Sequence, residues 1–141
     1  MTKLRFLLDS NVLSEPLRPY PNSNLIQKLT EHSEAIATAA IVLHELWYGC
    51  YRLPAPSNKR QIIEAYLVEE IEAKLPILSY TSDAAKWFAQ ERSRLVGIGR
   101  TPSYPDGQIA AIACVNNLIL VTNNISDYAD FQELQIENWL L

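Results

Sequence analysis

The feature that most constrains this chain is the alternation of short apolar runs with stretches of helical spacing. An unbroken apolar run is typical of a strand that is buried on both faces of a parallel sheet. Strands that alternate with helices favour a parallel sheet with helices packed on both faces. We therefore predict one α/β domain over residues 1–141. The expected strands are 4–8, 35–39, 76–80, 118–121 and, as a short last strand, 134–137.

The stretches between these runs carry capping residues, helical apolar spacing and terminating Pro, Gly or Asn residues. A short helix is expected directly after Asp9, and a long helix is expected from Asn58 to about Ala73. The other expected helices are 23–32, 41–48, 84–96 and 106–115.

The composition excludes several classes of protein. Cys50 and Cys114 are the two cysteines, too few for a disulfide framework and without zinc-ligand spacing. The apolar run before Asp9 is too short for a signal peptide, and no other run approaches membrane-spanning length. We therefore expect a cytoplasmic protein with no membrane segment. The 16 acidic and 12 basic side chains give a net charge of -4, which argues mildly against a broad nucleic-acid-binding surface.

Four of the acidic side chains fall where a parallel α/β sheet places its binding site. Such sites lie beyond the carboxyl ends of the strands. Asp9 directly follows the first expected strand, and Asp127 follows the fourth after a short polar segment. Glu45 lies about one turn into the helix after the second strand, and Asp106 begins the helix that leads into the fourth. All four can converge on one edge of the sheet.

Carboxylates that crowd together raise one another's pKa unless a cation offsets their charge. Mg²⁺ and Mn²⁺ prefer oxygen ligands and can activate water for phosphodiester hydrolysis. Each acid also has a simpler interpretation. Asp9 and Asp106 could be helix caps, Glu45 could lie on the solvent edge of its helix, and Asp127 could be a turn residue. Convergence of all four is the stronger indication of a site.

Four motifs in order resemble those of PIN-domain ribonucleases, of the kind that forms the toxin of VapBC-type toxin–antitoxin pairs. They are Leu8–Glu15 (LDSNVLSE), Glu45–Gly49 (ELWYG), Asp106–Ala113 (DGQIAAIA) and Val121–Tyr128 (VTNNISDY). The ending Glu137-Asn138-Trp139 is also similar to that of the family. The chain departs from the usual pattern at Ser10, where Thr is usual, at Trp47, where Arg is common, and at Tyr128, where Phe is commoner.

The resemblance implies a PIN-like parallel sheet and an endoribonuclease in which Asp9, Glu45, Asp106 and Asp127 bind one or two Mg²⁺ or Mn²⁺ ions and carry catalysis. It implies that Ser10, Asn11, Thr122 and Asn124 support these acids by hydrogen bonding. It also implies a homodimer, an RNA substrate, a VapB-type antitoxin as partner, and contact with promoter DNA only through that antitoxin.

Three other functions are alternatives to that of a toxin. A PIN nuclease could process RNA or DNA without an antitoxin, and absence of a small neighbouring reading frame would favour it. A non-catalytic PIN-like binding module would be expected to have lost some of the four acids. A phosphotransferase with Asp9 as nucleophile usually has a second carboxylate two residues later, where this chain has Asn11.

The excess of acidic over basic side chains equals the number of acids in the proposed metal site. Without the four acids, 16 − 4 = 12 acidic side chains face 12 basic ones. Bound divalent ions would offset the excess where a phosphate must lie. Arg92, Arg94 and Arg100, near the loop before Asp106, could steer RNA or simply form a solvated helix face. The charge pattern thus favours a local, metal-mediated contact with nucleic acid.

Overall fold

A computed structural model describes residues 3–141. Its centre is a five-stranded sheet in the order β3-β2-β1-β4-β5, in which every neighbouring pair is parallel. The strands are β1 (Phe6–Leu8), β2 (Ile36–Ala39), β3 (Ile77–Leu78), β4 (Ile119–Val121) and β5 (Ile136–Glu137). The predicted α/β class with a parallel sheet is therefore confirmed, although each strand is shorter than its apolar run.

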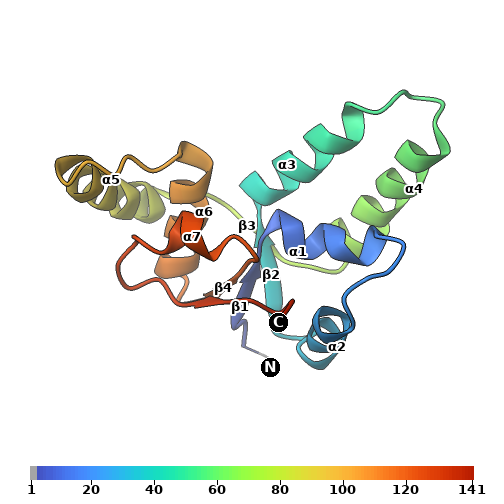
Figure 1. The fold of residues 1–141 in the computed structure, drawn as a ribbon, viewed down its shortest axis with the longest axis horizontal. Helices are drawn as coiled ribbons and strands as arrows, with labels where there is room; N and C mark the ends of the chain where they lie inside the picture. Colours follow the sequence, from blue (N-terminus) through green and yellow to red (C-terminus); the bar gives the residue numbers. More distant parts are fainter. Residues whose placement is uncertain (1–2) are drawn as a thin grey trace.

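Helices lie on both sides of the sheet, as the unbroken apolar runs indicate. In Figure 1, α1–α4 lie on one side and α5–α7 on the other. The α-helices are α1 (Ser10–Ser14), α2 (Ser23–Glu31), α3 (Ala40–Tyr51), α4 (Asn58–Tyr66), α5 (Ser82–Gly97), α6 (Tyr104–Val115) and α7 (Ile125–Tyr128). A 3-10 turn, η1 (Glu15–Leu17), follows α1, and a π-helical segment, η2 (Leu67–Glu72), continues α4.

Strand β1 is the central strand, and its three residues are all buried. Leu7 pairs with Ala37 of β2 on one side and with Leu120 of β4 on the other. The buried hydroxyl of Thr38 donates a 2.8 Å hydrogen bond to the carbonyl of Leu8, which ties β2 to the end of β1. The carboxyl ends of these three strands consequently meet at one edge of the sheet.

Two helix boundaries differ from the sequence expectation. The helix expected from Asn58 to Ala73 changes to π-helical hydrogen bonding at Leu67, and this segment keeps Leu67 and Ile71 buried in the core. Helix α6 begins at Tyr104, because the hydroxyl of Ser103 caps it by accepting a bond from the backbone N–H of Asp106. Asp106 is therefore inside the first turn of α6 and is not its N-cap.

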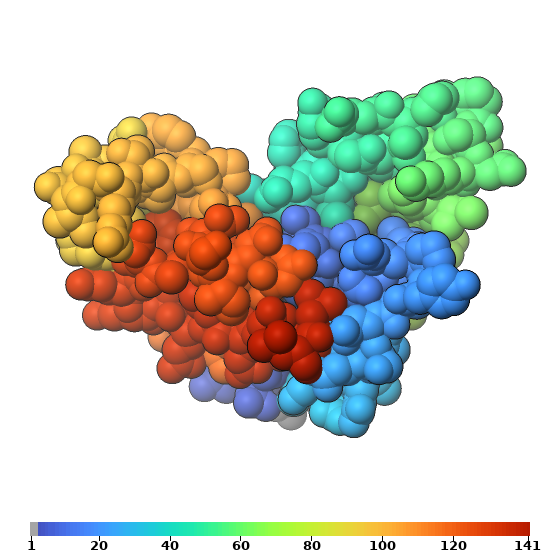
Figure 2. Space-filling model, in the orientation of Figure 1, coloured from blue at the N-terminus to red at the C-terminus, as the bar shows by residue number. Residues whose placement is uncertain are grey.

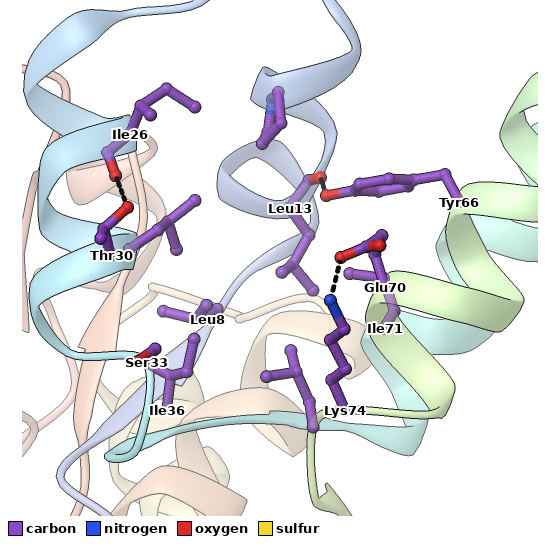
Figure 3. Close-up of a pocket in the computed structure, with 13 residues that line it drawn as sticks. Leu8, Leu13, Ile26, Thr30, Ser33, Ile36, Tyr66, Glu70, Ile71 and Lys74 are labelled. Carbon is purple, nitrogen blue, oxygen red and sulfur yellow. Dashed lines mark hydrogen bonds and ion pairs between the residues drawn. The ribbon is translucent and has the colours of Figure 1, made fainter.

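An apolar groove lies between α1, α2 and the α4–η2 segment, as Figure 3 shows. Its volume is about 460 Å³. The hydroxyl of Tyr66 donates to the carbonyl of Leu13 across it, and a Lys74–Glu70 ion pair lies at its rim. None of the four candidate acids lines this groove. Its other lining residues are Leu8, Pro16, Ile26, Leu29, Thr30, Ser33, Ile36, Ile71 and Leu75.

The helices were compared with the length and hydropathy of membrane-spanning helices. None of the helices within residues 3–141 has the length and apolar composition that crossing a bilayer requires.

Candidate active site

Asp9 lies at the carboxyl end of the central strand and is almost fully buried, with 4% of its surface exposed. Its Oδ1 accepts a 2.8 Å bond from the backbone N–H of Ser10, so Asp9 is the N-cap of α1. The backbone N–H of Asp9 donates to the carbonyl of Val121, the last residue of β4. The cap interpretation and the site interpretation are therefore compatible, because the capping carboxylate also lies beside the end of β4.

The segment after β4 closes around the other oxygen of Asp9. Thr122 donates its buried hydroxyl to Oδ2 of Asp9 at 2.9 Å. The amide of Asn11 donates to Oγ1 of Thr122 at 3.2 Å and to Oδ2 of Asp9 at 3.4 Å. The backbone N–H of Asn124 also donates to the Thr122 hydroxyl, at 3.0 Å. Asp9 thus holds together two segments that are far apart in sequence.

The four residues expected to support the acids do so in two ways. Asn11 and Thr122 contribute their side chains, as the resemblance implies. Ser10 and Asn124 contribute backbone N–H groups, and the side chain of Asn124 is exposed. Ser10 stands where the resembling family usually has Thr. This difference leaves the contact with Asp9 unchanged, because the contact comes from the backbone N–H of residue 10.

Glu45 projects from the middle of α3, on the helix that begins directly after β2. Partial burial of its carboxyl raises the pKa of Glu45, and the negative charges of Asp9 and Asp106 raise it further. The neighbouring His44 opposes this effect and lowers the pKa. Glu45 thus lies close enough to two other candidate acids to feel their charges.

Asp106 connects this group to the fourth acid. Burial raises the pKa of Asp106. A hydrogen bond to Ser103 opposes the shift, whereas the charges of Asp127 and Asp9 add to it. Asp106 and Asp127 also line one hollow of about 290 Å³, together with Arg100 and other residues of the α5–α6 connection and α7. Each of the four acids therefore interacts electrostatically with at least one other acid of the group.

In residues 3–141, the four acids have no Lys or Arg side chain as an ion-pair partner. Elsewhere on the same part of the chain, acids such as Glu91 and Asp130 are paired, with Arg94 and Arg100 respectively. The four acids thus differ from these paired carboxylates in having no Lys or Arg partner among the described residues.

The donor set fits a hard divalent cation, but as an open site. Among the described residues, no three acidic, His or Cys side chains are gathered closely enough to enclose one ion. Mg²⁺ usually takes one or two protein carboxylates and completes its shell with water and substrate phosphate. Asp9 at the N-cap of α1, Glu45 of α3 and Asp106 of α6 interact without enclosing a common point, which matches this kind of coordination.

The surface is hollowed at this place. Figure 2 shows a notch between α3, in green, and the α5–α6 segment, in gold and orange. Glu45 belongs to α3 and Asp106 to α6. In Figure 1 the sheet lies below the gap between these helices.

The three arginines near the loop before Asp106 have different roles. Arg94 bonds Glu91 at 2.7 Å and the carbonyl of Asp130 at 2.8 Å, so it holds α5 to the segment after α7. Arg92 lies over the ring of Tyr104. Arg100 pairs with Asp130 at 2.7 Å and lines the same hollow as Asp106. Arg100 is thus the one of these three that lines a hollow next to a candidate acid.

Sequence reasoning did not assign two side-chain contacts, of which the first lies in the site. The hydroxyl of Tyr128 donates to Oδ2 of Asp9 at 3.2 Å. Trp47, which stands where the resembling family often has Arg, donates its indole N–H to Glu72 at 2.6 Å and thereby joins α3 to η2. The departure from Phe at position 128 was a visible signal for the first contact, since a buried phenol needs a partner.

Comparison with known proteins agrees with the fold and the motifs. The sequence model of the PIN domain matches residues 6–133, so the chain belongs to the PIN domain family. It is 27% identical to ribonuclease VapC2 of Haemophilus influenzae over 97% of this chain and 99% of that protein. It is 28% identical to the tRNA(fMet)-specific endonuclease VapC of Salmonella typhimurium over 96% of this chain and 98% of that protein.

A solved structure supports the same relationship. VapBC2 from Rickettsia felis, bound to a DNA fragment from its promoter, contains a chain that superposes with a TM-score of 0.81 and 25% identity. The match covers 96% of this chain and 99% of that one. The resemblance to PIN-domain proteins of the VapC type is therefore confirmed along nearly the whole length of the chain.

Proposed function

We propose that this protein is a metal-dependent endoribonuclease, the toxin of a VapBC-type pair that acts in the cytoplasm. The observation that carries the proposal is the set of four interacting acids at the carboxyl edge of the sheet, which form no ion pair with Lys or Arg in residues 3–141. The similarity to proteins named ribonuclease and tRNA-specific endonuclease supports RNA as the substrate. A non-catalytic PIN-like module would not require this arrangement of acids.

Asp9, Glu45 and Asp106 would hold the principal Mg²⁺ or Mn²⁺ ion. Asp127 would assist a second ion or orient the attacking water. When bound, the metal would supply activation of water and neutralisation of charge on the phosphoryl oxygens. In the hydrolysis, a bond forms between the water oxygen and phosphorus, the bridging P–O bond breaks, and the leaving oxygen takes up a proton.

The chain's own contribution is to fix the carboxylates in place before substrate arrives. Asn11 and Thr122 hold one oxygen of Asp9, and the backbone N–H of Ser10 holds the other. The Asn124 backbone N–H fixes the Thr122 hydroxyl in turn. Because these donors are in position in the folded protein, Asp9 needs no reorganisation to act as a ligand.

The experiment is cleavage of a mixed RNA pool that includes tRNA, by the wild type and by Asp9→Asn, with Mg²⁺ or Mn²⁺. The wild type should cleave RNA and the variant should not. Equal activity of both proteins, or none in the metal-replete wild type free of any partner, would overturn the proposal. Circular dichroism of the variant checks that it remains folded, since Asp9 also caps α1.

The proposed partner is a VapB-type antitoxin, which would also carry the contact with promoter DNA, and the toxin itself would form a homodimer. The DNA-bound VapBC2 complex supports the antitoxin partner and the contact with promoter DNA. Co-expression with the small reading frame next to the gene tests it. The toxin should then be purified as a complex, and cells should survive its expression. Absence of such a reading frame would instead favour a PIN nuclease that processes RNA or DNA alone.

A further inference from the structure

Tyr128 is a buried tyrosine whose hydroxyl points into the candidate active site. It ends α7, and only 1% of its surface is exposed. Its ring lies in the hydrophobic core, where it packs against Phe131 with the ring centroids 6.4 Å apart. Its hydroxyl donates to Oδ2 of Asp9 at 3.2 Å. A phenylalanine would fill the same space without this bond, so the core does not require the hydroxyl.

With the bond from Tyr128, the two carboxylate oxygens of Asp9 accept unequal numbers of hydrogen bonds. Oδ2 accepts from Asn11, Thr122 and Tyr128, whereas Oδ1 accepts only the backbone N–H of Ser10. Three donors on one side hinder rotation of the carboxylate. Oδ1 is the oxygen that retains accepting capacity for another ligand.

The hydroxyl also joins two parts of the fold. Tyr128 belongs to α7, which follows β4, whereas Asp9 follows β1. A phenol has one hydrogen, and here Tyr128 donates it to the carboxylate of Asp9.

We propose that Tyr128 is a positioning residue that sets the orientation of the Asp9 carboxylate for a divalent cation. The inference rests on the proposed function, because it assumes that Asp9 binds the ion. Without the bond from Tyr128, the Asp9 carboxylate can rotate more freely. Binding an ion then requires the carboxylate to be ordered again, which lowers affinity.

Tyr66 provides a matched control. Tyr66 is partly buried, and its hydroxyl donates to a backbone carbonyl, that of Leu13. This contact lines the apolar groove, away from the four acids. Tyr66→Phe and Tyr128→Phe therefore both remove a hydrogen-bonded phenol hydroxyl, but only Tyr128→Phe removes a donor from Asp9.

The experiment measures Mn²⁺ binding to the metal-free protein, by electron paramagnetic resonance of the free ion or by calorimetry. Removing a group that orients a metal ligand typically costs about 10- to 100-fold in affinity. We expect Tyr128→Phe to raise the Kd for Mn²⁺ at least about ten-fold and Tyr66→Phe to leave it unchanged. In RNA cleavage at saturating Mn²⁺, Tyr128→Phe should lower kcat with little change in KM.

The outcomes separate this inference from the proposed function. If the wild type binds Mn²⁺ and cleaves RNA while Tyr128→Phe binds Mn²⁺ equally well, the role of Tyr128 is refuted and the proposed function stands. An equal loss of affinity in Tyr66→Phe also refutes it, because the effect would then be one of general stability. If the wild type neither binds Mn²⁺ nor cleaves RNA, both are overturned.

Discussion

The hydroxyl of Thr122 lies 2.9 Å from Oδ2 of Asp9, although 113 positions separate the two residues in the chain. The contact follows from the sheet. Leu8 of β1 is paired with Val121 of β4, so the residues that follow these strands are neighbours. The site is therefore a consequence of strand register, and a change at Thr122 should affect both the fold and the chemistry.

Replacing Thr122 by Val should destabilise the protein and weaken RNA cleavage. The fully buried hydroxyl donates to Asp9 and accepts from Asn11 and from the Asn124 backbone. Leaving such buried partners unsatisfied costs about 1–3 kcal/mol. Thr122→Ser keeps the hydroxyl and should retain most of the stability and activity. Urea unfolding measures the difference. Equal losses in the Val and Ser variants would show that the methyl group matters and the hydroxyl does not.

The raised pKa values of Glu45 and Asp106 predict how stability depends on pH without metal. A carboxyl whose pKa is raised by folding binds more protons in the folded than in the unfolded state. Stability is then highest below the ordinary pKa and falls as pH rises through the raised one. At neutral pH, metal-free Glu45→Gln should be at least as stable as the wild type.

Mg²⁺ should reverse this order. Binding stabilises the folded state by about 2.7 kcal/mol when the ion is present at 100 times its Kd. The wild type should gain stability on addition of Mg²⁺, and Glu45→Gln should gain less. Thermal unfolding at pH 7 with EDTA or with Mg²⁺ gives both comparisons. A Glu45→Gln protein that is less stable than the wild type in EDTA would contradict the repulsion between these acids.

Asp127→Asn should lower activity less than Asp106→Asn does. Asp127 is exposed, whereas Asp106 interacts with both Asp9 and Asp127. We expect a loss of about ten-fold for Asp127→Asn and of at least about a hundred-fold for Asp106→Asn, which correspond to about 1.4 and 2.7 kcal/mol. Asp130→Asn is the control, because Asp130 lines the same hollow but is paired with Arg100. Greater loss with Asp127→Asn than with Asp106→Asn would refute this division of roles.

Gly107→Ala should destabilise the protein and displace Asp106. A Cβ at position 107 would lie 2.0 Å from the ring of Phe88, so α5 and α6 would have to separate. Overpacking of this kind typically costs about 1–3 kcal/mol or more. Gly49→Ala is the control, since a Cβ there meets nothing within 4 Å, and it should stabilise α3 by about 0.5–1 kcal/mol. Similar unfolding midpoints for the two variants would contradict this packing.

Much of the architecture could be predicted from the sequence because it depends on local patterns. The apolar runs that end at Asp9 and Thr122 indicate buried parallel strands, and such strands place their following residues at one edge. The order of the strands could not be read in this way. It depends on long-range pairing of runs that are similar in composition, such as those of β1, β2 and β4.

The side-chain contacts show more clearly what could not be predicted from the sequence. The acids Asp9, Glu45 and Asp106 could be chosen because their positions relative to strands and helices are set by chain order. The bond from Tyr128 to Asp9 and the bond from Trp47 to Glu72 depend on how α7 and α3 pack against other elements. No local spacing encodes such packing, so these contacts became visible only in three dimensions.

The most direct test of the central claim is RNA cleavage by Glu45→Gln compared with Glu69→Gln. Both replace an exposed glutamate by its uncharged amide, but Glu45 interacts with Asp9 and Asp106 and Glu69 lies on η2. We predict that the wild type and Glu69→Gln cleave RNA equally with Mn²⁺ and lose activity in EDTA. Glu45→Gln should be at least about a hundred-fold slower with Mn²⁺. Full activity of Glu45→Gln, or cleavage that persists in EDTA, would contradict a metal-dependent nuclease built on these acids.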